Sequence, residues 1–448
     1  MNENILGKEN ITALFFKYSV PAIAGMLFLG LNTIVDGFFV GNYIGVHALA
    51  SVTIAMPFFS LMIAVGVVIG IGTQSMVGRK LGEGDNGAAD DTFKTSLLLM
   101  LGVSLLLSLI AVGFTKQIAV FLGASAQLMP LVTTYISYTG LFLPLLGIMF
   151  VLDYVLKVMG KPLYSMQVLI AAVLSHMLFN YLFIVQLGLG IKGAALATGL
   201  GYGIAFVMAI IPFITGRTTL KLGKGSFKRD LAYNIIYNGS SEGLSEISTG
   251  ITTFLFNITL MRYVGEVGVA AFTAVSYLSF VGNNILIGLS DGVGAIISYN
   301  YGSGKIERVK EALKLTGFAA FAIGVSVFTV ISLFAGEIIA IFLDANNDTV
   351  LAFAVYGAKL YAFAFIVNGL NIVASGYFTA ICNPLRAALI ALSKGIVWIG
   401  IGLVMLPKLL GVNGIWLTVP AAEMLTFLLS IALLYNHFKY QIQMNIRQ

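Results

Sequence analysis

The sequence predicts an all-α integral membrane protein in which twelve transmembrane helices form two pseudo-symmetric lobes of six. The prediction rests on an apolar composition, on evenly spaced apolar runs and on an internal duplication. Of the 448 residues, 58% are hydrophobic and 10% are charged, whereas an average soluble domain has roughly 25% charged residues. This composition excludes a water-soluble enzyme. Because one membrane-spanning helix takes ~20 apolar residues, the chain is long enough for about a dozen spans joined by short loops.

Six apolar runs bounded by polar or turn residues make up the first half of the chain. The first run follows a segment without the charged start and cleavage site of a secretory signal, so we expect it to remain as a span. The glycine-rich turn Gly82–Gly84 follows the second run, and Lys161 with Pro162 precedes the fifth. The six spans are predicted near residues 13–39, 51–77, 93–114, 131–155, 163–185 and 193–215.

A basic, glycine-containing stretch from Arg217 to Arg229 separates these runs from six more. We interpret residues 1–216 as an N-lobe, residues 217–230 as a cytoplasmic linker and residues 231–448 as a C-lobe. The second set of spans is predicted near residues 231–261, 271–299, 312–334, 354–380, 386–406 and 414–436.

The two halves match each other at an offset of 220 to 222 residues. The matching pairs are Tyr43–Gly45 with Tyr263–Gly265, Gly82–Gly84 with Gly302–Gly304, Lys161–Pro162 with Asn383–Pro384, and Gly190–Gly193 with Gly411–Gly414. Because each half holds an even number of spans, both halves enter the membrane from the same side, and an axis along the membrane normal should relate them. Transporters that rock two bundles around a midplane site have this organisation, so it points to alternating access.

The basic residues predict the orientation. With the N-terminus inside, 20 of the 25 Lys and Arg residues fall on the inner side and 5 on the outer side, a strong positive-inside bias. We therefore expect a multi-pass protein of the cell membrane with both termini in the cytoplasm. The net charge of +6 then reflects topology, with no nucleic acid as a partner. This count assigns Lys157 and Lys394 to inner loops.

Asp36 is the clearest ionisable residue inside a span. It lies on the outer half of span one, which contains no Lys or Arg that could pair with it. A charged group at the bilayer centre costs at least ~2.5–3.5 kcal/mol, so such residues are candidates for function. We predict that Asp36 couples transport to an ion by taking up and releasing it. The structural alternative is a carboxylate that only caps helix breaks near Gly37 and Gly41.

Other polar residues of the first lobe are candidates for the same site. His176 and Asn180 lie one turn apart on span five, Thr198 lies on span six, and Asn32 lies one turn before Asp36. Together they offer a proton relay or oxygen ligands for Na⁺; in the second case Asp36, Asn180 and Thr198 would hold the metal ion. The alternative is hydrogen bonding between helices, which Asn, Thr and His also provide in membranes.

Three acids are candidates in the second lobe. Glu242 and Glu246 lie one turn apart on span seven, where mutual repulsion favours a protonatable pair, and Asp291 lies in span eight. Hydrated residues near the cytoplasmic end are the competing interpretation. Asp153 is less informative, because it can reach Lys157 at i+4.

Motifs for other chemistries are missing from the sequence. Gly302–Lys305 is not a phosphate-binding loop, so ATP is not the direct fuel. We find neither a nucleophile elbow nor a zinc-binding histidine pair, and the single cysteine excludes a disulfide framework. We therefore expect that the protein is not an enzyme and binds no cofactor, and that an ion gradient supplies the energy for transport.

At this point the chain resembles the multidrug and toxic compound extrusion (MATE) transporters, which have a MATE/MOP-type fold. The resemblance covers nearly the whole chain and is carried by Val35–Gly41, Pro57–Phe59, Gly70–Thr73 and Gly193–Thr198. It implies export of chemically varied, often cationic amphipathic compounds in exchange for H⁺ or Na⁺. The expected partners are such compounds and the lipid bilayer, and we expect the chain to act as a monomer.

The resemblance also implies roles for individual residues. Asp36 takes the place of the family's main coupling acid. Many members add an asparagine and an acid one turn apart on span five, whereas this sequence has Asn180 and His176 there. Span ten has Asn368 and Asn371 in place of the aspartate that others use, so the second-lobe ion site is the weaker one.

Two other function classes remain open. A flippase for a lipid-linked saccharide shares this architecture, and an arginine-lined central cavity would favour it; the sequence places no Arg or Lys in mid-span of the first lobe. An integral-membrane enzyme would require a clustered catalytic set, which we do not find.

Overall fold

A computed structural model describes residues 5–340 and 348–446. In the first half the elements are α1 (Ile5–Lys8), α2 (Ile11–Tyr43), α3 (Val46–Gly82), α4 (Asn86–Gly113), α5 (Thr115–Phe121), α6 (Met129–Gly140), α7 (Leu143–Val158), α8 (Pro162–Asn180), the π-helical segment η1 (Tyr181–Gln186) and α9 (Gly190–Ile214). In the second half they are α10 (Arg229–Tyr263), α11 (Glu266–Gly302), α12 (Ile306–Ile339), α13 (Asp348–Tyr361), the 3₁₀ turn η2 (Ala362–Ala364), α14 (Phe365–Ala380), α15 (Pro384–Leu392), the π-helical segment η3 (Ser393–Val397), α16 (Trp398–Leu410) and α17 (Val412–Ile446).

Ten helices of the described chain are long and apolar enough to cross a membrane, and eleven if α6 and α7, bent by 49°, count as one broken span. The prediction of twelve exceeds this by one because of α10. That helix has 35 residues, but Glu242, Glu246 and many Ser, Thr, Asn and Gly residues make it too polar for the criterion. A long polar helix among apolar ones indicates a face that meets water or cargo in place of lipid.

The duplication is visible in matching helix breaks. Gly160 precedes α8 with φ +77°, and at the corresponding place before α15 Cys382 has φ +58°. Cys382 is the one residue other than glycine with positive φ in the described ranges. In both halves a proline then opens the helix at its first position, where the missing N–H costs nothing. Each of these helices runs into a π-helical segment, η1 or η3.

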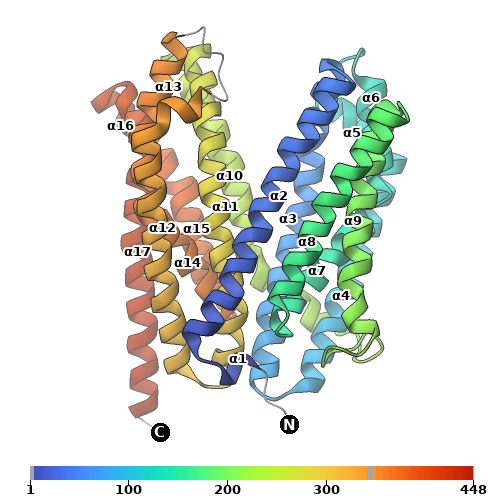
Figure 1. The fold of residues 1–448 in the computed structure, drawn as a ribbon. Helices are drawn as coiled ribbons and strands as arrows, with labels where there is room; N and C mark the ends of the chain where they lie inside the picture. The colour runs from blue at the N-terminus through green and yellow to red at the C-terminus, as the bar shows by residue number, and fades with distance from the viewer. Residues whose placement is uncertain (1–4, 341–347, 447–448) are drawn as a thin grey trace.

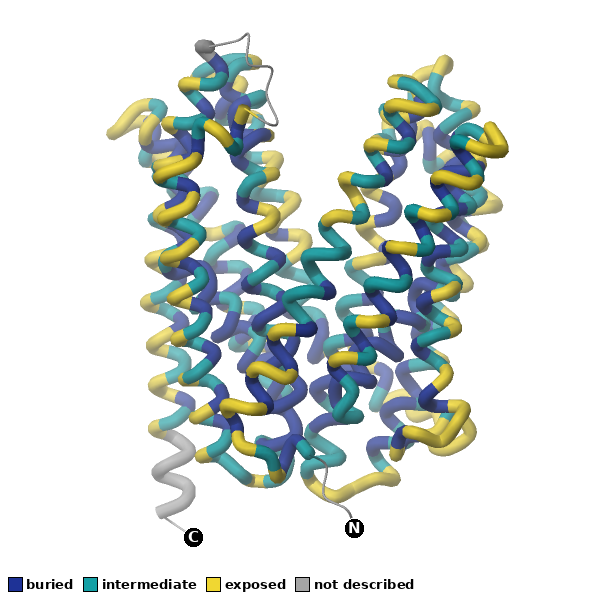
Figure 2. Tube along the Cα trace, viewed as in Figure 1, coloured by how far each residue is buried: buried dark blue, intermediate teal, exposed yellow. Residues whose placement is uncertain are grey.

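The helices form two bundles that diverge from one end of the molecule (Figure 1). The described chain begins in α1 and ends in α17 at the end where the bundles meet, which we call the narrow end. There α2 and α3 of the first bundle pack against α10 and α11 of the second. Figure 2 shows that buried residues concentrate in this region, whereas the inner faces of the bundles are more exposed toward the opposite, wide end.

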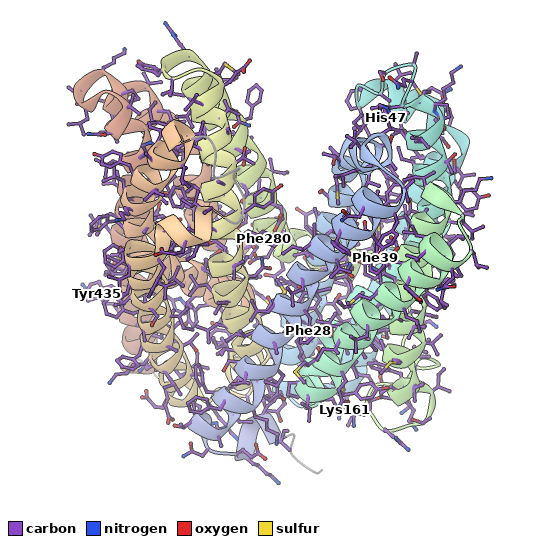
Figure 3. The ribbon with its side chains drawn as sticks, turned by 45° about the horizontal axis from the view of Figure 1, so that its top comes forward. Phe28, Phe39, His47, Lys161, Phe280 and Tyr435 are labelled. Carbon is purple, nitrogen blue, oxygen red and sulfur yellow. The ribbon has the colours of Figure 1, made fainter. Side chains whose placement is uncertain are left out.

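Small residues allow the bundles to approach closely. A side chain at Gly239 on α10 would overlap the backbone of Val68 on α3, and one at Gly72 on α3 would overlap the carbonyl oxygen of Ile235. Nearer the middle of the molecule, the ring of Phe280 on α11 lies against Gly30 on α2 (Figure 3). Backbone-to-backbone packing of this kind is how helices associate in membranes.

Hydrogen bonds reinforce the narrow end. Arg308 on α12 donates from Nη2 to the carbonyl oxygens of Leu6 (3.0 Å) and Glu9 (2.7 Å), and Asn300 donates to that of Leu6 (3.0 Å). The segment preceding α2 is thereby held by the second bundle. On the first bundle, the side chain of Asp91 on α4 accepts from the N–H of Ser226 (2.8 Å) and pairs with Lys228, which fastens the predicted linker 217–230 to α4.

We expect Gly239→Ala to hinder closure of the narrow end, because the added methyl group meets backbone that cannot rotate away. Overpacking of this kind costs roughly 1–3 kcal/mol, which shifts the equilibrium between the closed and open conformations about fivefold or more. Labelling of a cysteine placed at the buried Ser298 measures the opening. The matched control is Gly250→Ala on the same helix, where a methyl group meets nothing within 4 Å. Equal labelling in the two variants would contradict the expectation.

Candidate ion-coupling site and second-bundle acids

Three helices of the first bundle place polar side chains around Asp36. Asp36 lies on α2 about two turns before the helix ends, and only 6% of its surface is exposed. His176 and Asn180 project from one face of α8, and Thr198 projects from α9, which packs against α8. His176 and Asn180 are buried to a similar degree.

Asn180 joins the two titratable groups. Its Nδ2 donates to Asp36 Oδ1 at 3.2 Å and lies 3.1 Å from His176 Nε2. Thr198 Oγ1 lies 3.2 Å from the same His176 nitrogen and donates to the carbonyl oxygen of Ala194 at 3.0 Å. The buried carboxylate of Asp36 thus accepts a hydrogen bond from an amide, which compensates part of the loss of water.

The hydrogen bond at the other ring nitrogen determines the tautomer of His176. Nδ1 lies 2.7 Å from Asn32 Oδ1, an oxygen that can only accept, so Nδ1 carries a hydrogen and donates it. In the neutral ring the lone pair then lies on Nε2, 3.4 Å from Asp36 Oδ1. Two groups with lone pairs this close are stabilised by a proton, so the arrangement is suited to hold one at the Asp36–His176 pair.

A small cavity of about 10 Å³ adjoins the cluster and is lined by Asn32, His176, Thr198 and Tyr202 together with apolar residues. A space of this size is about what one water molecule needs. Asn180 Oδ1 is buried without a hydrogen-bond partner, so the site has an unused acceptor. Tyr202 was not identified as a candidate from the sequence. Its position one turn after Thr198 on α9 could have indicated that the two side chains share a helix face.

The structure brings all five first-lobe candidates together: Asn32, Asp36, His176, Asn180 and Thr198. Their role in coupling stays a prediction. Within the described residues the ion-pair partner of Asp36 is His176, and no group of three or more His, Cys, Asp or Glu residues is placed to bind a metal. Na⁺ would therefore rely on the carboxylate of Asp36 and on neutral oxygens.

The second-bundle acids are not arranged as one equivalent cluster. Glu242 accepts a hydrogen bond from Thr379 Oγ1 (3.3 Å) on α14, and Glu246 is exposed one turn further along α10. Asp291 on α11 instead turns to the first bundle, where Tyr154 donates to its Oδ2 at 3.3 Å and Lys157 Nζ lies 4.0 Å away.

Two lysines lie elsewhere than the orientation count assigned them. Lys157 is not in a loop: it lies in the last turn of α7, is 6% exposed, and pairs with Asp153 at 3.2 Å without reaching toward water. Lys394 lies in η3, inside the predicted span 386–406, 3.8 Å from Glu423 on α17. The signal for Lys394 was present, because an ionisable residue within a predicted span marks a candidate site.

Asn371 completes the surroundings of Glu423. Its Nδ2 donates to Glu423 Oε2 at 2.7 Å, and its Oδ1 accepts from Ser430 at 2.9 Å. Asn368 Oδ1 lies 3.4 Å from Lys394 Nζ. In the polar centre of the second bundle, the ammonium group of Lys394 therefore already neutralises Glu423. A site for an external cation would require a carboxylate without such a partner.

Comparisons by sequence place the chain among transport proteins. A family model described as MatE matches residues 21–182 and 243–403, two blocks whose starts are 222 residues apart. The multidrug export protein MepA of Staphylococcus haemolyticus is 25% identical over 431 residues, which cover 96% of this chain and 94% of that protein. MepA of Staphylococcus saprophyticus is 25% identical over 438 residues with the same coverage.

Solved structures show a similar fold. An outward-facing conformation of a multidrug resistance MATE family transporter of the MOP superfamily has a TM-score of 0.91 at 21% identity, covering 99% of this chain and 98% of that one. A MOP superfamily transporter from Pyrococcus furiosus, whose binding pocket is described as having reverse polarity that suggests a different function, has a TM-score of 0.89 at 21% identity over 98% of both chains.

We expect Asn180→Ala to destabilise the fold by about 1–3 kcal/mol, because Asp36 and His176 each lose a buried donor. Asn42→Ala is the matched control. The side chain of Asn42 donates to the carbonyl oxygen of Phe38 on the exposed face of the same helix, so this substitution should change the free energy of unfolding by no more than about 0.5 kcal/mol. Thermal unfolding of the purified protein measures both. Equal shifts in melting temperature for the two variants would mean that the Asn180 amide stabilises the fold no more than an exposed asparagine does.

Proposed function

The chain belongs to the MatE family of membrane transporters, and from this premise we propose that it is an ion-coupled antiporter that exports amphipathic, often cationic drugs and toxic compounds by alternating access. The predicted family and fold class are confirmed: the chain is a multi-pass transporter, not an enzyme. Its relatives are named for multidrug export, and the cargo class is carried over from them.

The balance of charge among the ionisable side chains enclosed by the helices supports a cationic cargo. Around the polar centres the described helices present the carboxylates of Asp153, Glu242, Glu246, Asp291 and Glu423 but only two ammonium groups, those of Lys157 and Lys394. An excess of negative charge at low dielectric attracts cations. Exposed aromatic rings on α10 and α11, including Phe254, Tyr277 and Phe280, offer faces on which a cationic ring system can stack.

We propose that the narrow end is cytoplasmic and that this conformation is open to the outside of the cell membrane. The positive-inside bias of the loops supports this orientation. The two bundles would then move as units joined by the linker 217–230. Opening at the narrow end would require Gly239 and Gly72 to leave the backbones they contact.

The short contact between His176 Nδ1 and Asn32 Oδ1, 2.7 Å, is the observation that carries the coupling proposal. Because Nδ1 is committed to Asn32, the Nε2 lone pair faces the Asp36 carboxylate, and one proton between them relieves the repulsion. We therefore propose H⁺ as the coupling ion. Na⁺ is the alternative, with Asp36, Asn180 and Thr198 as ligands, but the amide nitrogen of Asn180 and not its oxygen points at Asp36.

Protonation and cargo need only favour different conformations for exchange to occur. A proton entering from the wide end neutralises the buried carboxylate of Asp36 and ends the need for the amide donor of Asn180. The helices α2 and α8, which that bond joins, can then shift relative to each other. Cargo leaves to the outside, the bundles rock, and the proton is released at the narrow end.

The flippase alternative keeps one supporting observation, since a protein of similar fold is described as having a different function. Two lysines, Lys157 and Lys394, are enclosed by the helices, and the sequence had suggested none for the first lobe. Both, however, lie next to carboxylates, so neither offers the unpaired positive charge that an anionic lipid head group would require.

Asp36→Asn should reduce export of ethidium from cells by roughly tenfold or more, because the neutral amide cannot alternate between two charge states. Binding of ethidium to the purified variant should persist. Glu266→Gln, which removes an exposed carboxylate at the wide end, should export ethidium like the parent. Full efflux by Asp36→Asn would overturn the coupling role.

A pH jump across proteoliposomes should drive ethidium movement, and a Na⁺ jump at constant pH should not. His176→Gln should weaken the response to the pH jump about tenfold, since glutamine cannot share the proton with Asp36. If the Na⁺ jump drives ethidium movement instead, and His176→Gln responds to the jumps like the parent protein, the sodium alternative is favoured.

A further inference from the structure

A largely enclosed ion pair joins the two bundles at Lys157. The ammonium group of Lys157 on α7 lies 3.2 Å from Asp153 Oδ2 in its own bundle and 4.0 Å from Asp291 Oδ2 on α11 in the other bundle. It also lies over the ring of Tyr154, 4.5 Å from the centroid. With side-chain exposures of 8% for Lys157 and 13% for Asp291, water screens the pair little.

Other contacts hold Asp291 at the same place. Tyr154 donates to Asp291 Oδ2 at 3.3 Å, and Gln74 Nε2 on α3 lies 3.4 Å from the Asp291 carbonyl oxygen. All these partners belong to the first bundle, whereas Asp291 belongs to the second. The carboxylate of Asp291 is therefore neutralised only while the narrow end is closed.

The two acids that share Lys157 differ in what happens to them when the bundles separate. Asp153 lies one turn before Lys157 on α7, so this pair moves as a unit and survives. Asp291 loses both Lys157 and Tyr154. A buried charge left without its partner is strongly unfavourable, so Asp291 then needs another cation.

We propose that Lys157 is a coupling residue that occupies Asp291 as an internal cation in the outward-open conformation and yields it to cationic cargo when the narrow end opens. Cargo cannot remain at Asp291 as the bundles close, because the ammonium group of Lys157 returns to it. Asp291 thus selects for positive charge on the side where cargo enters. This inference rests on the proposed export of cations.

Accessibility of the narrow end tests the cross-bundle pair without any transport. Ser298 on α11 is fully buried against Gly78 of the first bundle, so a cysteine there reacts with a maleimide only when the bundles part. Burial raises the pKa of the native Cys382 thiol to about 11, so little reactive thiolate is present at pH 7. Protein in lipid nanodiscs without Ser298→Cys supplies the baseline.

In the Ser298→Cys background, Lys157→Met and Asp291→Asn should each raise the labelling rate about tenfold or more. The double variant should add little to either single variant, because both remove the same interaction. Asp153→Asn, which leaves the cross-bundle pair in place, and Lys161→Met, a lysine at the same end, should label slowly. Unchanged labelling in Lys157→Met and Asp291→Asn, or additive effects in the double variant, would overturn the proposal.

Binding of ethidium tests the exchange of cations. Asp291→Asn should weaken ethidium binding about tenfold, whereas Lys157→Met, which removes the competitor, should strengthen it. Weaker binding in Lys157→Met would contradict the exchange. If the parent protein neither binds nor moves ethidium, the proposed function fails, while the labelling results still decide whether Lys157 holds the bundles together. A thermal unfolding measurement on each variant separates misfolding from opening.

Discussion

A carboxylate enclosed by membrane helices must have a partner or a proton, and this constraint organises the structure. Asp36 meets it through Asn180 and His176, which come from a helix that begins more than a hundred residues later. Because the partner is an imidazole whose other nitrogen is already bonded to Asn32, the partnership itself depends on a proton. In the proposed mechanism, the interaction that satisfies Asp36 in the first bundle is therefore also the one through which a proton acts.

The second bundle meets the same constraint differently. Glu423 is paired with Lys394 and Asn371 inside the bundle, so its charge is balanced in any arrangement of the two halves. Asp291 is balanced across the interface by Lys157, so its charge is balanced in one arrangement only. A pair within a bundle stabilises the fold, whereas a pair between bundles stabilises a conformation. The duplicated halves therefore share a helix arrangement, in which η1 and η3 follow corresponding proline-opened helices, but pair their ionisable side chains differently.

Close packing makes such an interface possible. Glycines on α3 and α10 let backbones touch at the narrow end, and the N-terminal segment is held there by Arg308 and Asn300. These contacts join backbone to backbone, or a polar side chain to a carbonyl oxygen. They can hold helices together in lipid, where the hydrophobic effect contributes little to helix association.

The sequence alone determined the membrane class, the duplication and the position of Asp36, because hydropathy, repeat spacing and a lone acid in a span are local properties. It also put His176 and Asn180 on one face, since helical periodicity is local too. Only the tertiary structure decided that these residues meet Asn32 and Asp36, which are 144 positions away along the chain. It also decided that Lys157 and Lys394 are enclosed, because counting loop charges assumes that lysines at span ends reach water. Whether a charged side chain is exposed or paired depends on helices that are distant in sequence. A local sequence pattern does not show which distant helices pack together.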